Sequence, residues 1–215
     1  MTGFADRREA GRVLADVLSG YKGQSVVYAL PRGGVELGVE VSLALDAPLE
    51  LITARKVGHP ANPEYAVCAV TETGPLVCNE AERVRLDPTW LAGAEAAERS
   101  EAVRRRQVYG LGLRSFSVAG KVAIVVDDGI ATGLTMRAAV SELQYQQPGK
   151  LIVAVPCAPH AAIDDLYELA DEMIVLTDPS EYLGAVGAYY AAFPQLTDED
   201  VVDLLGASSW RRLLQ

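Results

Sequence analysis

Five short apolar runs, alternating with segments of helical pattern, constrain the fold of this chain more than any other feature. They are SVVYAL (25–30), LELITARK (49–56), VAIVVD (122–127), LIVAVP (151–156) and MIVLT (173–177). Segments between them carry apolar residues at helical spacing, as at Val35, Val39 and Leu43. This alternation predicts an α/β fold: a doubly wound, mainly parallel central sheet of about five strands, flanked by helices.

The sequence predicts a single domain over residues 1–215, because no internal repeat and no Ser-rich or Pro-rich linker divides it. Residues 57–87 are expected to be an insertion. In it, VGHPANPE should be an irregular, flexible loop because of Gly58 and two prolines, and AVCAV and LVC should pair as a short hairpin. Residues 178–195 are expected to be a second irregular addition. Pro88 to Tyr109 should form a long polar helix whose arginines, 104–106, lie on a solvated face.

Composition disfavours several classes of protein. Nineteen Lys and Arg against 29 Asp and Glu give a net charge of -10, which disfavours a broad surface for nucleic acid or anionic membrane. The three cysteines, Cys68, Cys78 and Cys157, form no CxxC pair, so we expect buried free thiols rather than disulfides or a zinc site. Because MTGFADRREAG is charged and no run approaches about 18 apolar residues, the expected location is cytoplasmic.

The stretch VAIVVDDGIATGLTM, Val122 to Met136, places two adjacent carboxylates where a buried strand should end. Asp127 and Asp128 repel each other, so we expect a positive or hydrogen-bond-donating partner from outside the sequence. In an open parallel sheet, ligands bind beyond the carboxyl ends of the strands, where these residues fall. The loop GIATGLT then enters a helix N-terminus, whose amides, with the hydroxyls of Thr132 and Thr135, suit a phosphate.

Two common phosphate-binding motifs do not describe this loop. GxxxxGK[ST] fails because the step from Gly129 to Gly133 is one residue short and Leu134 stands in place of the lysine, and GxGxxG is absent. A ligand with a phosphate beside a vicinal diol does fit, since two carboxylates can accept hydrogen bonds from two hydroxyls while the loop binds the phosphate. A ribose 5-phosphate has that chemistry.

The order apolar run, Asp127, Asp128, three residues, Thr132, Gly133, one residue, Thr135 resembles the signature of type I phosphoribosyltransferases, which bind 5-phosphoribosyl-1-pyrophosphate (PRPP). LPRGG resembles their pyrophosphate loop, and RKVGHPANPE resembles their flexible catalytic loop. With YLGAVGAYYAAFPQ, the pattern covers most of the chain and is similar to stand-alone bacterial phosphoribosyltransferase-like proteins. The resemblance implies transfer of the 5-phosphoribosyl group to a nitrogen nucleophile, such as a nucleobase, with loss of pyrophosphate and with Mg²⁺ bound beside PRPP.

The resemblance also implies a role for each matching residue. Catalysis would depend on Arg55, Lys56, Asp127 and Asp128, and the two carboxylates would orient Mg²⁺ through water. Pyrophosphate would bind Arg32, Gly33 and Gly34, with a cis peptide bond before Arg32. Ribose 5-phosphate would bind the segment of Asp127, Asp128, Gly129, Ile130, Ala131, Thr132, Gly133, Leu134 and Thr135.

Simpler interpretations of these residues stay open. PRGG is also compatible with a plain turn, and Arg55 with Lys56 is also compatible with a solvated basic pair. His59, in the same loop, is expected at the surface, and its participation stays open. Residues 178–195 match the hood that covers the base in the family, where Tyr189, Tyr190 and Phe193 would either stack on the acceptor or only pack together.

Departures from the family leave the acceptor open. Hypoxanthine-guanine members carry an acidic residue before the Thr-Gly pair and a Lys after it, where this chain has Ala131 and Leu134, so the usual general base is missing. Three functions are therefore compared: a phosphoribosyltransferase, a PRPP-binding regulator or sensor without turnover, and a PRPP-directed phosphate-sugar hydrolase. The basic residues of the two loops favour turnover. A homodimer is expected because relatives often form one.

Overall fold

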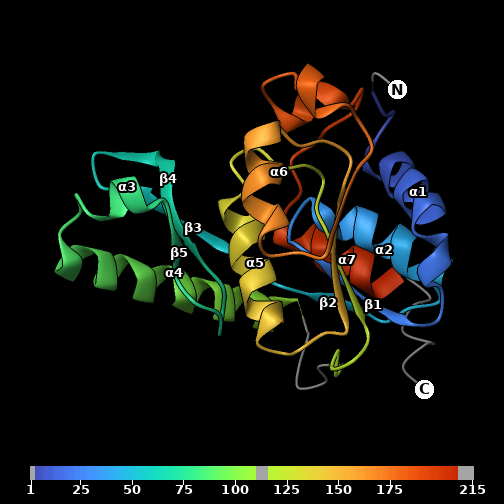
Figure 1. The fold of residues 1–215 in the computed structure, drawn as a ribbon, viewed down its shortest axis with the longest axis horizontal. Coiled ribbons are helices and arrows are strands. Elements are labelled where there is room, and N and C mark those ends of the chain that lie inside the picture. The colour runs from blue at the N-terminus through green and yellow to red at the C-terminus, as the bar shows by residue number, and fades with distance from the viewer. Residues whose placement is uncertain (1–2, 110–115, 208–215) are drawn as a thin grey trace.

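A five-stranded parallel sheet forms the centre of the computed structural model, which describes residues 3–109 and 116–207 (Figure 1). Its strands, in spatial order, are β2 (Leu49–Leu51), β1 (Ser25–Ala29), β6 (Val122–Val126), β7 (Lys150–Val155) and β8 (Glu172–Val175). Every neighbouring pair is parallel. The direction of strand addition reverses between β1 and β6: β2 is added on one side of β1, and β6, β7 and β8 are added in turn on its other side. The predicted fold class is confirmed.

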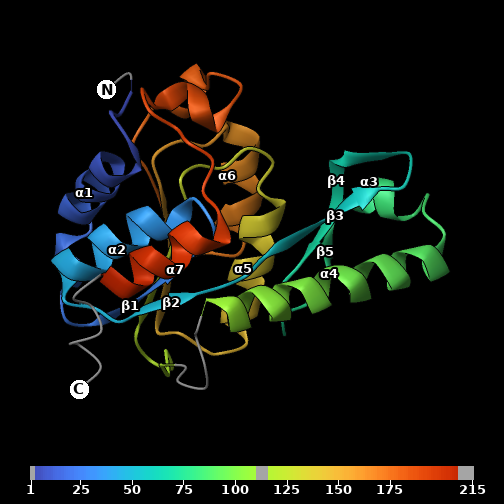
Figure 2. The ribbon, with the colours of Figure 1, turned by 180° about the vertical axis from the view of Figure 1, so that it is seen from behind.

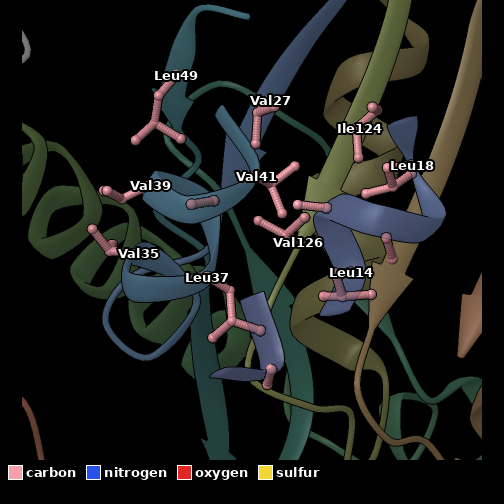
Figure 3. Close-up of a cluster of buried hydrophobic side chains, with 14 of the residues drawn as sticks. Leu14, Leu18, Val27, Val35, Leu37, Val39, Val41, Leu49, Ile124 and Val126 are labelled. Atoms are coloured by element: carbon pink, nitrogen blue, oxygen red, sulfur yellow. The ribbon is translucent and has the colours of Figure 1, made fainter. Parts of the chain in front are cut away.

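Alternate residues of the strands face two helical layers, as the pleat of a strand requires. Side chains such as Val27 and Ile124 pack with α1 (Arg7–Val17), α2 (Gly34–Leu45) and α7 (Asp198–Ala207), which lie together in Figure 2. Their neighbours, such as Val26 and Val125, pack with α5 (Leu134–Gln144) and α6 (His160–Tyr167). Figure 3 shows side chains of the first layer meeting the sheet. A short 3₁₀ turn, η1 (Ser19–Tyr21), joins α1 to β1.

A second, antiparallel sheet stands beside the body of the protein (Figures 1 and 2). It consists of β3 (Arg55–His59), β4 (Asn62–Val70) and β5 (Val77–Cys78), and it is accompanied by α3 (Glu80–Arg83) and α4 (Pro88–Val108). The predicted hairpin between AVCAV and LVC is confirmed as the β4–β5 pair. The apolar run LELITARK is not one strand, because its last two residues begin β3 in this other sheet.

The prediction that VGHPANPE lacks regular structure is wrong. Most of it lies in β3 and β4, and the prolines are accommodated because Pro60 falls in the turn and Pro63 lies beside irregularities in the strand register. Gly58 permits the close approach of the two strands, since a Cβ there would lie 2.2 Å from the carbonyl oxygen of Pro63. Glycine and proline in this segment therefore shape a bulged hairpin instead of preventing one.

The expectation of free thiols is wrong for two of the three cysteines. Cys68 on β4 lies directly opposite Cys78 on β5, and the two form a disulfide with Cα atoms 3.9 Å apart. Strand pairing brings them together, which spacing along the chain did not indicate. Cys157 is a buried free thiol, as expected.

Residues 178–195 contain two 3₁₀ turns, η2 (Pro179–Glu181) and η3 (Val186–Tyr189). This segment meets the N-terminal end of the chain through a β-bridge between Phe4 and Tyr190. Among the described residues, no helix combines the length with the hydropathy that a transmembrane span needs.

Candidate active site

A cavity of about 420 Å³ lies at the carboxyl ends of β1 and β6. These strands are neighbours, with Ala29 opposite Val126, so the loops that follow them meet at the point where the strand order reverses. Ligands of open α/β sheets bind at such a point. The cavity is lined by Leu30, Pro31, Arg32, Gly33, Ala54, Arg55, Lys56, Arg105, Asp127, Asp128, Gly129, Ile130, Ala131, Thr132, Gly133, Thr135, Met136 and Val186.

The structure therefore brings together most of the residues that the sequence predicted for one site. The cavity joins Arg32 and Gly33 after β1, Arg55 and Lys56 of β3, and residues 127–133 with Thr135 after β6. The predicted site residues outside the lining are Gly34, Leu134, Tyr189, Tyr190 and Phe193. His59 is not in the lining either, and its Nδ1 accepts a hydrogen bond from the amide of Ala61 (3.1 Å).

The two carboxylates at the end of β6 differ in their surroundings. Asp127 accepts a hydrogen bond on Oδ1 from the backbone amide of Asp128 (2.9 Å). Burial, reinforced by the charge of Asp128, raises the pKa of Asp127 well above its usual range. The pKa of Asp128 is also raised, because burial outweighs the attraction of its hydrogen-bond partner, the guanidinium of Arg7.

Arg7, at the start of α1, is the partner of the candidate site that the sequence did not indicate. Its Nε donates to Oδ2 of Asp128 (2.8 Å) across a separation of 121 residues, and its Nη1 donates to the carbonyl oxygen of Pro194 (2.8 Å). Its guanidinium lies 3.8 Å from the ring centroid of Phe193, and the residue is only 5% exposed. The expectation that the positive partner comes from outside the sequence is thus wrong for Asp128, because the chain itself supplies Arg7.

The loop after β6 has the backbone shape of an anion site. Gly133 has φ 77° and immediately precedes α5, so the free amides of the first helical turn are directed toward the loop. Gly129 has φ 157°, and a Cβ there would lie 2.7 Å from both Cys157 Sγ and a methyl carbon of Val186. Both glycines are therefore required by backbone shape or space.

The loop after β1 presses against the carboxylates. The Pro31–Arg32 peptide bond is cis, as the resemblance implied. A Cβ on Gly33 would lie 1.8 Å from Oδ2 of Asp128, and a Cβ on Gly34 would lie 2.8 Å from the carbonyl oxygen of Val126. Only glycine permits this close contact, and Arg32, which precedes Gly33 in the cavity lining, has its Nη1 4.0 Å from Oδ1 of Asp198 on α7.

Basic side chains gather on another side of the same cavity. Lys56 and Arg55 reach it from the start of β3, and Nε of Arg55 donates to Oε2 of Glu98 on α4 (2.8 Å). Arg105, also on α4, lines the cavity, although its arginine run was expected to be a solvated face. The rotation of a helix about its axis decides which residue of such a run turns inward, and the run itself carries no signal of it.

Two of the three aromatic residues of the predicted hood, Tyr189 and Tyr190, are buried, whereas Phe193 is 36% exposed, and none of the three lines the cavity. Tyr189 is 3% and Tyr190 is 8% exposed, and the hydroxyl of Tyr190 donates to the backbone oxygen of Asp128 (2.6 Å). The ring of Phe193 stacks on Tyr190 at 4.9 Å and also contacts Arg7. From this segment it is Val186 that lines the cavity. In this structure Tyr189 and Tyr190 are packed in the interior, and stacking of any of the three rings on an acceptor stays a prediction.

The carboxylates fit a Mg²⁺ ion held mainly by other ligands. Oδ1 of Asp127 and Oδ2 of Asp128 already accept hydrogen bonds, which leaves each side chain one further oxygen. Within residues 3–109 and 116–207, no group of three or more His, Cys, Asp or Glu side chains is placed to hold a metal. Mg²⁺ commonly binds through one or two carboxylates and completes its shell with water and substrate phosphates, so this donor set is sufficient for it.

Comparison with known proteins identifies relatives over nearly the whole chain. The family model described as "Phosphoribosyl transferase domain" matches residues 7–190. The Mycobacterium tuberculosis protein named "Putative phosphoribosyl transferase Rv0571c" is 37% identical over 205 residues, covering 94% of this chain and 46% of its own length. The chain thus spans about half the length of that relative.

Solved structures agree with this result. The crystal structure of TT1426 from Thermus thermophilus matches with a TM-score of 0.79 and 39% sequence identity, covering 94% of this chain and 97% of that one. The AQ2163 protein from Aquifex aeolicus has a TM-score of 0.51 at 13% identity, covering 79% of this chain and 72% of its own, which is a likeness of fold alone.

Proposed function

The chain belongs to the phosphoribosyl transferase domain family, and from that premise we propose that it transfers the 5-phosphoribosyl group of PRPP to a nitrogen nucleophile and releases pyrophosphate. One observation carries the proposal: a single cavity joins a carboxylate pair and a glycine-shaped phosphate loop to Arg32, Arg55 and Lys56. This combination matches PRPP, which carries a phosphate on C5, a diol at C2 and C3, and a pyrophosphate on C1 of one ribose ring.

Different residues of the cavity bind the three parts of PRPP. The 5-phosphate lies in the loop of residues 129–135, where amides at the start of α5 donate to it. The ribose hydroxyls donate to Asp127 and to Oδ1 of Asp128, since Oδ2 of Asp128 is held by Arg7. The pyrophosphate lies against Arg32 and Gly33 of the loop after β1.

Catalysis in this proposal is positioning and electrostatic stabilisation rather than covalent chemistry. The nucleophile attacks C1 of the ribose as the bond to pyrophosphate breaks, so negative charge grows on the leaving group. Arg32, Arg55 and Lys56 stabilise that charge. When bound, Mg²⁺ supplies further charge neutralisation on the pyrophosphate, with Asp127 and Asp128 orienting its water ligands.

The acceptor belongs to the class of nitrogen nucleophiles, with a nucleobase as the first candidate. Leu134 is 6% exposed and packs against Ala69 and Ala138, so it presents no polar group to a base. Ala131 lines the cavity and offers no carboxylate as a general base. An acceptor that needs no deprotonation by this loop fits the site better than hypoxanthine or guanine. Cytoplasmic location and a homodimer stay predictions.

The proposal is tested by following pyrophosphate release from PRPP and Mg²⁺ with a panel of purines, pyrimidines and small amines. Release that depends on one acceptor, together with formation of the matching ribosylated product, is the expected result. Binding of PRPP without release under every acceptor favours the sensor, and release without any acceptor favours the hydrolase.

A double variant, Asp127→Asn with Asp128→Asn, tests the assignment of the ribose site. It should abolish PRPP binding in calorimetry while the protein stays folded by circular dichroism, because amides accept hydrogen bonds more weakly than carboxylates and bring no charge for Mg²⁺. Undiminished binding would remove the diol assignment.

A further inference from the structure

Three consecutive arginines end α4, and each has a different environment. Successive residues of an α-helix point about 100° apart, so Arg104, Arg105 and Arg106 cannot share one face. Arg104 is 52% exposed in its side chain and bonds to Glu101 on its own helix. Arg105 has a side chain only 19% exposed and lines the candidate active site.

Arg106 fixes the direction in which Arg105 points. Its Nη1 donates to the carbonyl oxygen of Leu51 at the end of β2 (3.2 Å). Its guanidinium also lies 3.7 Å from Glu50 and 3.4 Å from Glu72. Because these contacts tie α4 to the edge of the central sheet, the helix cannot rotate freely about its axis, and Arg105 stays directed at the cavity.

Arg105 shares its helix face with the residue that holds Arg55. Glu98 precedes it by seven residues, about two helical turns or 10 Å along the axis, so both side chains lie on the same side of α4. Glu98 accepts from Nε of Arg55 at 2.8 Å, which places this face of α4 against the start of β3. Among the residues that the structure describes, four basic side chains line the cavity: Arg32, Arg55, Lys56 and Arg105.

We propose that Arg105 is a further pyrophosphate-binding residue, contributed by a helix that lies outside every motif of the sequence resemblance. The inference rests on the proposed function, since it concerns the leaving-group end of the same cavity. The carboxylates and the α5 amides already provide for the ribose and its 5-phosphate. Arg105 joins the three cations already assigned to pyrophosphate and adds positive charge where the leaving group becomes more negative.

A purely structural role for Arg105 would be its ion pair with Glu101, at 3.0 Å and a spacing of four residues, near the negative end of the helix dipole. Arg104 provides a matched control for that alternative. It bonds to the same Glu101 from the adjacent position, carries the same charge at the same end of α4, and does not line the cavity. It also forms an ion pair with Asp198 on α7, at 3.7 Å, and Asp198 does not line the cavity either.

The experiment measures the binding of two probes, inorganic pyrophosphate with Mg²⁺ and ribose 5-phosphate, to the full chain by titration calorimetry. Arg105→Ala should weaken pyrophosphate by about tenfold or more, the usual effect of losing a charge-assisted hydrogen bond, and leave ribose 5-phosphate unchanged. Arg104→Ala should leave both unchanged. Arg105→Lys should recover part of the loss, because it keeps the charge without the planar fork.

The outcomes separate this inference from the function on which it rests. If the wild type binds both probes and Arg105→Ala binds pyrophosphate as tightly as the wild type does, the inference is overturned and the proposed function stands. Equal weakening by Arg104→Ala and Arg105→Ala, with equal losses of thermal stability, assigns Arg105 a structural role and also overturns it. If the wild type binds neither probe, the proposed function fails and the inference with it. Should Arg105→Ala not fold, Arg105→Gln gives the same comparison with a smaller change in volume.

Discussion

Arg7→Met should lower the free energy of unfolding of the ligand-free protein far more than the same substitution at a surface arginine does. Methionine keeps most of the length and apolar volume of the side chain but cannot donate to Asp128 or to the carbonyl oxygen of Pro194, each 2.8 Å away in the wild type. The Asp128 side chain is only 15% exposed, so the variant leaves its charge buried and without this partner. Removing one member of a buried ion pair typically costs about 3–5 kcal/mol in the free energy of unfolding.

The pH dependence of that loss has a definite sign. Burial already raises the pKa of Asp128, and Arg7 opposes the rise, so removing Arg7 raises this pKa further. A carboxyl with a raised pKa in the folded state carries no penalty when it is protonated in both states, and its penalty develops as the pH rises above about 4. The destabilisation by Arg7→Met should therefore be larger at pH 8 than at pH 5.

The measurement is urea unfolding of Arg7→Met, Asp128→Asn and the double variant, without ligand. The double variant should be less destabilised than the sum of the single ones by about 1.5–3 kcal/mol, since an Asn leaves no buried charge to neutralise. Arg8→Met is the control: its side chain is 55% exposed and 3.7 Å from Glu36, so it should cost less than about 0.5 kcal/mol. Additive effects, or an Arg7→Met cost no greater than that of Arg8→Met, would refute the reasoning.

Three further changes test other parts of the site and fold. Asp127→Asn should raise the free energy of unfolding of the ligand-free protein, by an amount that grows between pH 4 and pH 8 in urea titrations, because burial and a neighbouring carboxylate raise the pKa of the wild-type acid. Gly33→Ala should lower both the free energy of unfolding and the affinity for PRPP, because its Cβ would lie 1.8 Å from a carboxylate oxygen of Asp128. Gly93→Ala is the control: a Cβ there meets nothing within 4 Å, so this change should stabilise α4 by about 0.5–1 kcal/mol in urea unfolding. The disulfide between Cys68 and Cys78 predicts one titratable thiol per denatured chain without reductant, and three after reduction.

The parts of the site that the sequence predicted are those built by neighbouring residues of the chain. Asp127 and Asp128 directly follow β6, and the loop after them enters α5, so one continuous segment carries both the acids of the candidate site and their backbone geometry. The same holds for Arg32 and Gly33. Local order of apolar, acidic and glycine residues is enough to predict such a unit, because strand, turn and helix follow each other directly.

Contacts between distant segments could not be predicted in this way. Cys68 meets Cys78 only because β4 and β5 pair in one register, and a register shifted by one residue would turn their side chains to opposite faces. Arg105 faces the cavity because of how α4 is rotated against the sheet. Even the hairpin at VGHPANPE depends on a partner strand, whose presence outweighs the local preferences of glycine and proline.

One local feature of the sequence does distinguish Arg7, namely its position at the start of a helix. It occupies the first position of α1, directly after the capping residue Asp6, where the helix dipole disfavours a cation. A buried arginine at that position needs a compensating anion, and the unpaired acids at the end of β6 need a cation. The two observations are connected: Arg7 is the cation that pairs with Asp128, and Asp127, whose pKa is raised by burial and by the charge of Asp128, is the less compensated of the two acids. The ion pair with Arg7 offsets part of the repulsion between the two adjacent carboxylates, which is how the fold accommodates both acids directly after β6.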